Sequence, residues 1–290
     1  MGCKQILIKI LKFLIYKFLF TINNNTKNAI NLSHYMNNTP DQFLNIRFFK
    51  RKFKLTVSTQ TLLALNSLEK NKDYIKKVYD FSNSPNVIFD IGANIGYWSL
   101  SFFEINKKGI DKINCFEPNR NTFKILNYNL NEINKIIINN FGLSEKNEIA
   151  KLSFPDNEEH RIHNLGLYSL YAKSNINFQE VKLKKFDDLY QVNVKSNYFF
   201  KIDVEGAEHR VLEGATNFLS SNCHITILIE LNSSIDRYSP DNVKKTIKIL
   251  NHLNYDCYYF ENNKFVKLAK EKLNNHIKLN NSFDYLFRNF

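Results

Sequence analysis

The stretch Phe89-Asp90-Ile91-Gly92-Ala93-Asn94-Ile95-Gly96 decides the fold of this chain. It ends a short apolar run, 86–91, with a carboxylate and a turn of small residues, and a helical pattern over 95–105 follows. Small residues at such a turn let the backbone approach a ligand closely and permit positive φ. A strand that ends in this way before a helix is typical of doubly wound α/β folds, in which ligands bind beyond the carboxyl ends of the strands.

Strand and helix patterns continue to alternate after this turn. Further strands are expected at 112–117, 135–140, 198–203 and 224–231, and helices at 119–131, 207–219 and 240–253. Such alternation predicts a parallel sheet with right-handed crossovers. The segments 255–260 and 264–268 are expected to close the sheet as an antiparallel pair.

The pattern divides the chain into four parts. We expect a basic amphipathic helix at 1–22, an extension of helix and strand at 23–84, the α/β domain at 85–270 and a polar tail at 271–290. Within the domain, 143–183 breaks the alternation and is expected to be an insertion for substrate recognition.

The first of these parts has an apolar run interrupted by Lys9, Lys12 and Lys17. Interior lysines argue against a membrane span and favour a helix on an anionic membrane surface. Packing of this helix on the protein itself is the alternative.

The charge and the cysteines of the chain indicate its partners and its cellular compartment. The chain of 290 residues has 40 Lys and Arg against 28 Asp and Glu, a net charge of +12, which favours anionic partners. Its four cysteines are scattered and no Cys or His spacing suits zinc. Free thiols fit a reducing compartment, so we expect a cytoplasmic protein, peripheral on the inner membrane surface if the first helix binds lipid.

The residues around the opening turn indicate the kind of cofactor. The loop lacks the third glycine of a dinucleotide fingerprint, and Asp90 just before it would repel a pyrophosphate, which disfavours an NAD-linked oxidoreductase. Glu117 ends the second strand, where a carboxylate accepts the hydroxyls of a ribose. S-adenosylmethionine has a ribose, an ammonium and a sulfonium, so it is the expected cofactor. Its expected binding residues are Asp90, Gly92, Ala93, Asn94, Gly96 and Glu117.

Three segments resemble one family. They are Asp90-Ile91-Gly92-Ala93-Asn94-Ile95-Gly96-Tyr97, Cys115-Phe116-Glu117-Pro118-Asn119 and Lys201-Ile202-Asp203-Val204-Glu205-Gly206-Ala207-Glu208. Over about 87–231 the chain is similar to the FkbM family of class I methyltransferases.

The resemblance implies a Rossmann-like sheet of seven strands and O-methylation, often of sugars in polysaccharides or glycolipids. It also implies that Asp90, Gly92 and Asn94 line the methionine end of the cofactor and that Glu117 holds the ribose. Gly142 and Ser144 would then face the adenine.

The chemistry is expected at the end of the fourth strand. Methyl transfer to a hydroxyl needs an aligned acceptor oxygen and a group that takes its proton. Asp203 is the first candidate for this group, and Glu205 and His209 are the reserves. Lys201 either neutralises the cluster or acts near the acceptor. No metal is indicated, although Mg²⁺ held by Asp203, Glu205 and Glu230 is an alternative.

The sequence therefore predicts an S-adenosylmethionine-dependent O-methyltransferase that acts on a saccharide or on a glycolipid or polysaccharide precursor. A nucleic-acid methyltransferase is the second reading, disfavoured because no basic-aromatic stripe is visible. A non-catalytic protein that binds the cofactor at the membrane surface is the third.

Overall fold

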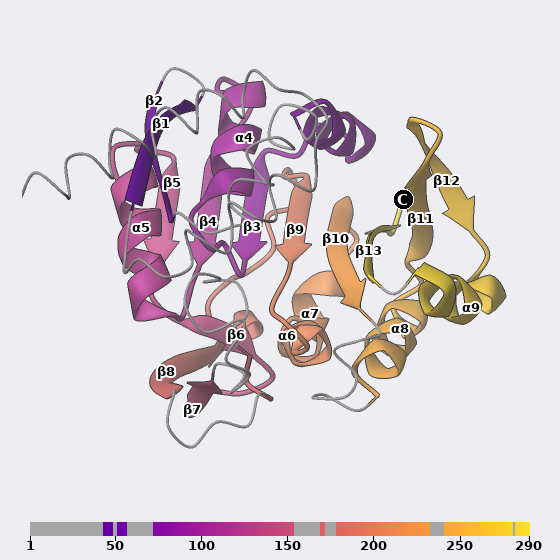
Figure 1. Ribbon diagram of the computed structural model, residues 1–290. Helices are drawn as coiled ribbons and strands as arrows, with labels where there is room; N and C mark the ends of the chain where they lie inside the picture. Colours follow the sequence, from indigo (N-terminus) through magenta and orange to yellow (C-terminus); the bar gives the residue numbers. More distant parts are fainter. Residues whose placement is uncertain are drawn as a thin grey trace, which may run out of the picture.

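A large mixed sheet forms the centre of the molecule. The computed structural model describes residues 43–48, 51–56, 72–153, 169–171, 178–232, 241–280 and 282–290. The sheet has eight strands in the order β12-β11-β13-β10-β9-β3-β4-β5 (Figure 1). These strands are β3 (Val87–Ile91), β4 (Lys112–Phe116), β5 (Ile136–Asn139), β9 (Tyr198–Ile202), β10 (Ile225–Asn232), β11 (Asp256–Glu261), β12 (Lys264–Leu268) and β13 (Ser282–Arg288).

The strand directions match a doubly wound fold. Strands β5, β4, β3, β9 and β10 are parallel, whereas β13 runs antiparallel to both β10 and β11. The chain order reverses between β3 and β9, so a crevice is expected beyond the carboxyl ends of these two strands. The antiparallel pair β11–β12 was predicted. Strand β13 was not predicted, and it is the eighth strand of a sheet for which seven were expected.

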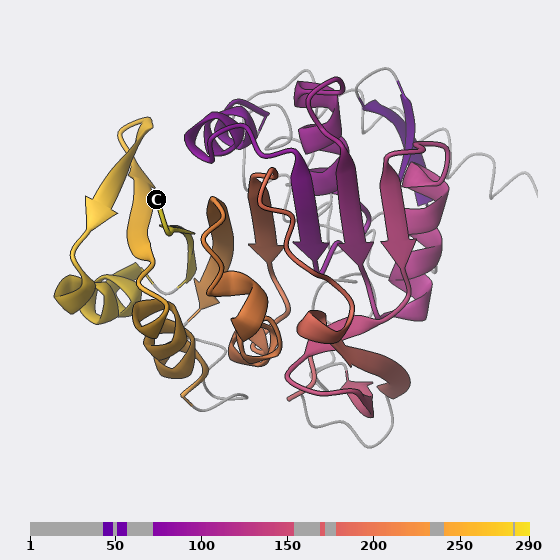
Figure 2. The ribbon, with the colours of Figure 1, turned by 180° about the vertical axis from the view of Figure 1, so that it is seen from behind.

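Helices cover both faces of this sheet (Figures 1 and 2). The helices are α4 (Tyr97–Ile105), α5 (Arg120–Leu130), α6 (Glu208–Gly214), α7 (Thr216–Leu219), α8 (Asn242–His252) and α9 (Lys270–Asn280). One core cluster joins the sheet to α4, α5 and a helix at 72–81, and the other joins it to α6, α7, α8 and α9.

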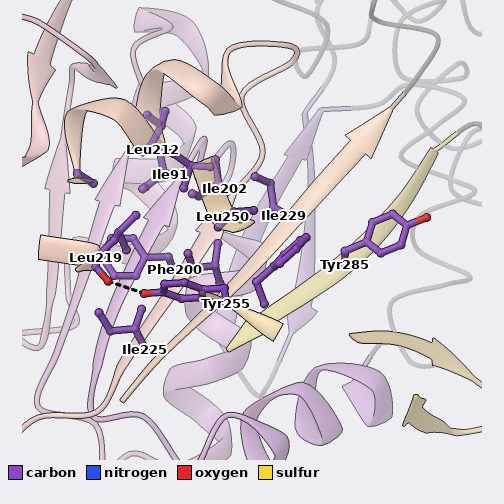
Figure 3. Packing of buried hydrophobic residues seen from close by; sticks show 14 of the residues in the cluster. Ile91, Phe200, Ile202, Leu212, Leu219, Ile225, Ile229, Leu250, Tyr255 and Tyr285 are labelled. Carbon is purple, nitrogen blue, oxygen red and sulfur yellow. Dashed lines mark hydrogen bonds between the residues drawn. The ribbon is translucent and has the colours of Figure 1, made fainter. Parts of the chain in front are cut away.

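Each central strand contributes residues to both core clusters in turn, because successive side chains point to opposite faces of the sheet. Ile91, Ile202 and Ile229 turn to the α6–α8 side, where they meet Leu212 and Leu250 (Figure 3). On this side the Tyr255 hydroxyl donates to the Leu219 carbonyl over 3.0 Å.

The last segment of the chain corrects one expectation. Residues 271–290 are not a polar tail: they form most of α9 and the strand β13, which lies between β10 and β11. Tyr285, Leu286 and Phe287 are at most 1% exposed, because Tyr285 and Phe287 pack into the core cluster on one face of the sheet and Leu286 packs into the cluster on the other. The domain predicted to end at 270 therefore continues through Arg288.

The segment 143–183 was predicted to be an insertion, and its described parts belong to a second, smaller sheet. This sheet has the order β6-β8-β7, with β6 (Gly142–Ser144), β7 (Glu148–Ser153) and β8 (Phe178–Lys185). It lies beyond the arrowheads of the parallel strands (Figure 1). The insertion is therefore at the end of the sheet where ligands bind.

The extension at 23–84 contributes a hairpin, β1 (Phe43–Phe48) and β2 (Arg51–Thr56), and the helix at 72–81. Asn129 of α5 anchors this hairpin: its Oδ1 accepts from Lys54 N over 2.7 Å, and its Nδ2 donates to Lys54 O over 3.1 Å. The amphipathic helix expected at 1–22 falls outside the described residues. Among the helices that are described, none has the length and apolar character to cross a membrane.

Candidate active site

A pocket opens where β3, β4 and β9 end and the smaller sheet begins. It encloses about 720 Å³ of empty space, part of which is open to solvent. Its walls come from the main sheet, the smaller sheet and the turn after β9: Ile91, Gly92, Asn94, Phe116, Glu117, Pro118, Gly142, Leu143, Leu152, Leu170, Leu183, Asp203, Val204, Glu205 and Ala207. Apolar walls with a few polar groups are typical of a small-molecule site.

Gly92 forms the floor of this pocket. Its φ is +79°, and a Cβ at this position would lie 1.8 Å from the backbone oxygen of Asp203. Only glycine avoids that collision, so the turns after β3 and β9 meet backbone against backbone. The pocket depends on this contact because both turns line it.

Glu117 is held rigidly at the opposite side of the floor. Its Oε2 accepts from Asn94 N over 3.0 Å and its Oε1 accepts from Asn119 N over 2.9 Å. Each carboxylate oxygen has a second lone pair, so both remain able to accept from a ligand hydroxyl. Burial raises the pKa of Glu117 to about 7, and donors from a diol would favour its charged form.

Asp90 lies behind the floor and does not line the pocket. It is 1% exposed, and its Oδ2 accepts from Ser99 of α4 over 2.6 Å. Among the described residues its Oδ1 has no hydrogen-bond partner. Burial raises the pKa of Asp90, and Lys201, directly opposite on β9, opposes that rise.

Asp203 and Glu205 line the pocket from the turn after β9. Asp203 Oδ2 accepts from Lys201 Nζ over 2.8 Å, and the Asp203 side chain is 35% exposed. Glu205 adopts a positive φ of 51°, an unusual conformation for a residue with a side chain. Burial, followed by repulsion from Asp203, raises the pKa of Glu205 to about 9, so Glu205 is protonated at neutral pH.

The smaller sheet is tied to this same turn. The Ser169 hydroxyl donates to the Glu205 carbonyl over 2.6 Å, and the ring of Tyr171 stacks 6.3 Å from that of His209. Arg210 of α6 also pairs with Glu145 and Glu148 of the insertion. Leu170, between Ser169 and Tyr171, is thereby placed in the pocket wall.

His209 is not brought to the pocket. It is 6% exposed, and its Nδ1 lies 2.7 Å from Asn242 Oδ1 of α8. Asn242 Nδ2 donates to Glu208 Oε2 over 2.6 Å, so one asparagine joins both residues to α8. Burial raises the pKa of Glu208 to about 7. The structure therefore gives His209 a packing position.

The predicted site residues divide into those that line the pocket and those that only lie near it. The predicted residues that line the pocket are Gly92, Asn94, Glu117, Gly142, Asp203 and Glu205. Ala93 is in the core, and a Cβ on Gly96 would collide with Leu126 and Leu130 of α5, so this glycine serves helix packing. Ser144 is buried and donates to Glu145 Oε2 over 2.6 Å.

Sequence analysis did not predict two sets of residues in or near the site. Leu152, Leu170 and Leu183 of the insertion line the pocket, and no motif marks them. Asp284 was placed in the tail, but it lies directly opposite Glu230 in the β10–β13 pair. In the part of the chain that is described, no three His, Cys, Asp or Glu side chains converge as metal ligands, Asp203, Glu205 and Glu230 included.

These features fit a nucleoside ligand with a cationic end. Glu117 is positioned for a ribose diol, Gly92 lets the turns after β3 and β9 meet at the floor, and Asp203 adds a carboxylate near the floor. A doubly wound sheet in which an antiparallel strand, here β13, lies between two parallel ones, together with such a pocket, defines the class I S-adenosylmethionine-dependent methyltransferases.

The family is shown by sequence comparison. The model of the methyltransferase FkbM domain matches residues 90–257, more than half of the chain. The chain belongs to the FkbM methyltransferase family. Comparison with curated proteins finds no significant match.

Solved structures with a related fold are methyltransferases of low sequence identity. Methyltransferase FkbM from Methylobacillus flagellatus is 15% identical with a TM-score of 0.42, and the match covers 71% of this chain and 44% of that one. This chain therefore spans less than half the length of that relative. TYW2 from M. jannaschii, solved with AdoMet, is 12% identical with a TM-score of 0.44 and 86% coverage of both chains. An O-methyltransferase from Bacillus cereus, solved with SAH, is 10% identical with a TM-score of 0.40, covering 95% of this chain and 96% of that one.

Proposed function

We propose that this methyltransferase methylates a hydroxyl group of a saccharide, in a glycolipid or polysaccharide precursor. The observation that carries the proposal is Asp203, a partly exposed carboxylate in the pocket wall whose Oδ2 is fixed by Lys201. A hydroxyl acceptor needs such a group, because its proton must leave as the new bond forms.

Residues of the chain account for donor binding. Glu117 would hold the ribose, Gly92 and Asn94 the methionyl side, and Phe116, Gly142 and Leu143 the base. When bound, S-adenosylmethionine supplies a methyl group whose carbon–sulfur bond breaks, with the electron pair passing to sulfur. The close contact between Gly92 and the Asp203 backbone brings the turns after β3 and β9 together at the wall of this pocket.

Asp203 then orients the acceptor and takes its proton. Among the described residues its Oδ2 is bound by Lys201, which leaves Oδ1 for the hydroxyl of the acceptor. The oxygen–carbon bond forms as that proton passes to the carboxylate, so charge is conserved within the site. Glu205, protonated at neutral pH, can donate a hydrogen bond to a second hydroxyl of the same ring.

The choice of a saccharide rests on the family and on the composition of the chain. The expected basic helix at 1–22 would keep the enzyme on an anionic membrane surface, where lipid-linked sugars are presented. Flotation of the full chain with vesicles containing phosphatidylglycerol, compared with pure phosphatidylcholine vesicles, tests this location. Equal flotation with both vesicles would remove the argument for a lipid-linked acceptor.

Production of S-adenosylhomocysteine with a panel of glycan and glycolipid acceptors tests the proposed reaction. We expect turnover with at least one saccharide and a loss of about 100-fold or more in kcat in Asp203→Asn, with donor affinity retained. Asp256→Asn, which removes a surface carboxylate paired with Lys267, is the matched control. Turnover confined to nucleic acid, or an Asp203→Asn variant as fast as the parent protein, would contradict the proposal.

A further inference from the structure

Two aromatic rings outside the pocket are exposed, and each has a lysine over one face. Phe178 of β8 is 41% exposed, and Lys151 Nζ of β7 lies 4.5 Å from the centre of its ring. Tyr128 of α5 is 46% exposed, and Lys54 Nζ of β2 lies 4.4 Å from the centre of its ring. Each pair therefore offers a ligand an apolar surface and a positive charge at one place.

A stripe on α5 connects the two pairs. Arg120, Lys124 and Tyr128 are spaced four residues apart, so they lie along one side of the helix, and all three are exposed. Lys124 has no ion-pair partner among the described residues. The stripe is about 12 Å long, because an α-helix rises about 1.5 Å per residue.

The start of β8 lies against the first turn of α5. Gln179 Oε1 accepts from Arg120 N over 3.0 Å, and the Arg120 guanidinium donates to the Glu180 carbonyl over 3.3 Å. Phe178 directly precedes Gln179, so it lies next to the Arg120 end of the stripe. Figures 1 and 2 both show the smaller sheet just below this end of α5.

The same sheet also reaches the acceptor end of the pocket. Phe178 is paired with Ser153 on β7, and Ser153 is bridged to Ser169, whose hydroxyl donates to the Glu205 carbonyl. Neighbouring strands lie about 4.8 Å apart, which puts Phe178 about 10 Å from Ser169. A path therefore runs from Glu205 across the smaller sheet to α5 and on to the hairpin.

This path is positively charged. Its side chains are Lys151, Phe178, Arg120, Lys124, Tyr128 and Lys54, which we term the basic–aromatic track. The sequences of the four elements that carry it, β2, α5, β7 and β8, contain nine Lys and Arg residues against two acidic residues, Glu148 and Glu180. Glu148 is paired with Arg210 of α6. Spacing along the chain does not reveal the track, because its members come from four separate elements.

We propose that the acceptor saccharide belongs to an anionic glycan whose chain lies along the basic–aromatic track. The inference rests on the saccharide acceptor of the proposed function and names its class. The methylated sugar occupies the pocket beside Asp203, and the sugars that follow it leave past Ser169. Apolar faces of these sugars contact the exposed rings, while their carboxylates or phosphates pair with the lysines and with Arg120.

The pocket favours a glycan over a nucleic acid as the occupant. Asp203 and Glu205 line its acceptor end, and Leu152 and Leu170 add aliphatic walls. A nucleic acid has a phosphate at each nucleotide, so an entering nucleotide would bring negative charge toward Asp203, whereas a glycan can present an uncharged sugar. The two exposed rings also lie at opposite ends of the track, whereas successive stacked bases need rings that are close together.

Calorimetry with oligogalacturonate tests the track, with the methyl ester of the same oligomer as an uncharged probe of equal length. The variants are Lys124→Glu and Tyr128→Ala. Lys248→Glu is the matched control, because it makes the same change in net charge on the exposed side of α8. That helix has three lysines but no Phe, Tyr or Trp.

We expect the parent protein to bind the charged oligomer and not its ester, with an affinity that falls as salt is added. Lys124→Glu and Tyr128→Ala should each weaken this binding about threefold or more, since each removes one contact of the track. Lys248→Glu should change the affinity by less than about 1.5-fold, because its charge lies outside the track.

Equal binding of the charged oligomer and its ester would overturn the inference, as would equal effects of Lys124→Glu and Lys248→Glu. Tighter binding of a single-stranded RNA of the same charge, weakened by the same two variants, would assign the track to a nucleic acid and overturn it as well. Methylation of a neutral saccharide by a protein that does not bind the charged oligomer would overturn only this inference. Binding that depends on the track, without methylation of any glycan, would support the track and contradict only the proposed reaction.

Discussion

Three carboxyl groups in this protein keep their protons at pH values where Asp and Glu side chains are ordinarily ionised. The pKa is raised to about 9 for Glu205 and to about 7 for Glu208 and Asp284, each mainly by burial. A carboxyl group with a raised pKa binds more protons in the folded than in the unfolded protein between its two pKa values. The free energy of unfolding contributed by these groups therefore falls as pH rises from about 4.5 to 9.

Glu205→Gln should remove the largest part of this dependence. Glutamine resembles the protonated acid, so we expect a gain of about 1–3 kcal/mol in the free energy of unfolding at pH 9 and little change at pH 5. Urea unfolding at both values of pH measures the difference. A Glu205→Gln variant that is less stable than the parent at pH 9 would show that the pKa of Glu205 is not raised in the folded protein.

The placement of single residues around the pocket was predicted in part. The positions of Gly92, Glu117 and Asp203 follow from their places at strand ends, because carboxyl ends of parallel strands meet at one edge of a sheet. The burial of Asp90 behind Gly92 and the bond between His209 and Asn242 depend on tertiary packing. Spacing in the sequence does not reveal either contact.

At the scale of elements, the contact of α6 with α8 depends on one buried polar network. Asn242 joins Glu208 and His209, and all three side chains are at most 6% exposed. Asn242→Ala should lower the free energy of unfolding by about 2–4 kcal/mol, because it leaves two buried polar groups without partners. Chemical denaturation measures this loss.

Lys248→Ala, on the exposed side of α8, is the control for that substitution. It should change the free energy of unfolding by less than about 0.5 kcal/mol. Equal effects of the two substitutions would mean that the network does not hold α6 to α8.

The parallel strands and their helices were predicted from the alternation of apolar runs, but the final strand was not. Its sequence, Ser282–Arg288, includes an aspartate and follows the polar helix α9, so the whole segment 271–290 was expected to be a polar tail. An antiparallel strand that comes last in the chain and pairs between β10 and β11 is specified by long-range contacts. Asp284 was missed for this reason.

The whole molecule depends on that last strand. Leu286 is 1% exposed at the centre of β13, whereas Phe290 at the end of the chain is 38% exposed. Leu286→Ala should cost about 2–5 kcal/mol of unfolding free energy, and Phe290→Ala less than about 1 kcal/mol. Thermal or urea unfolding of the two variants compares them. A Leu286→Ala variant as stable as the parent would contradict the position of β13 inside the sheet.

The two sheets together create the site. The main sheet supplies Gly92, Glu117 and Asp203, and the smaller sheet supplies apolar walls and the Ser169 contact to Glu205. Three carboxylates, Glu117, Asp203 and Glu205, thus line the pocket of a chain with a net charge of +12. The basic composition of the whole chain therefore does not describe the pocket.

Calorimetric titration with S-adenosylmethionine tests the central claim most directly, on the parent protein, Gly92→Ala and the control Gly109→Ala. A Cβ on Gly92 would lie 1.8 Å from the Asp203 backbone oxygen, whereas a Cβ on Gly109 would meet the movable side chain of Asn106, outside the pocket. We predict binding by the parent and by Gly109→Ala, and a loss of about 100-fold or more in Gly92→Ala with its helical circular dichroism retained. A parent protein that does not bind S-adenosylmethionine, or a Gly92→Ala variant that binds as tightly as the parent, would contradict this account.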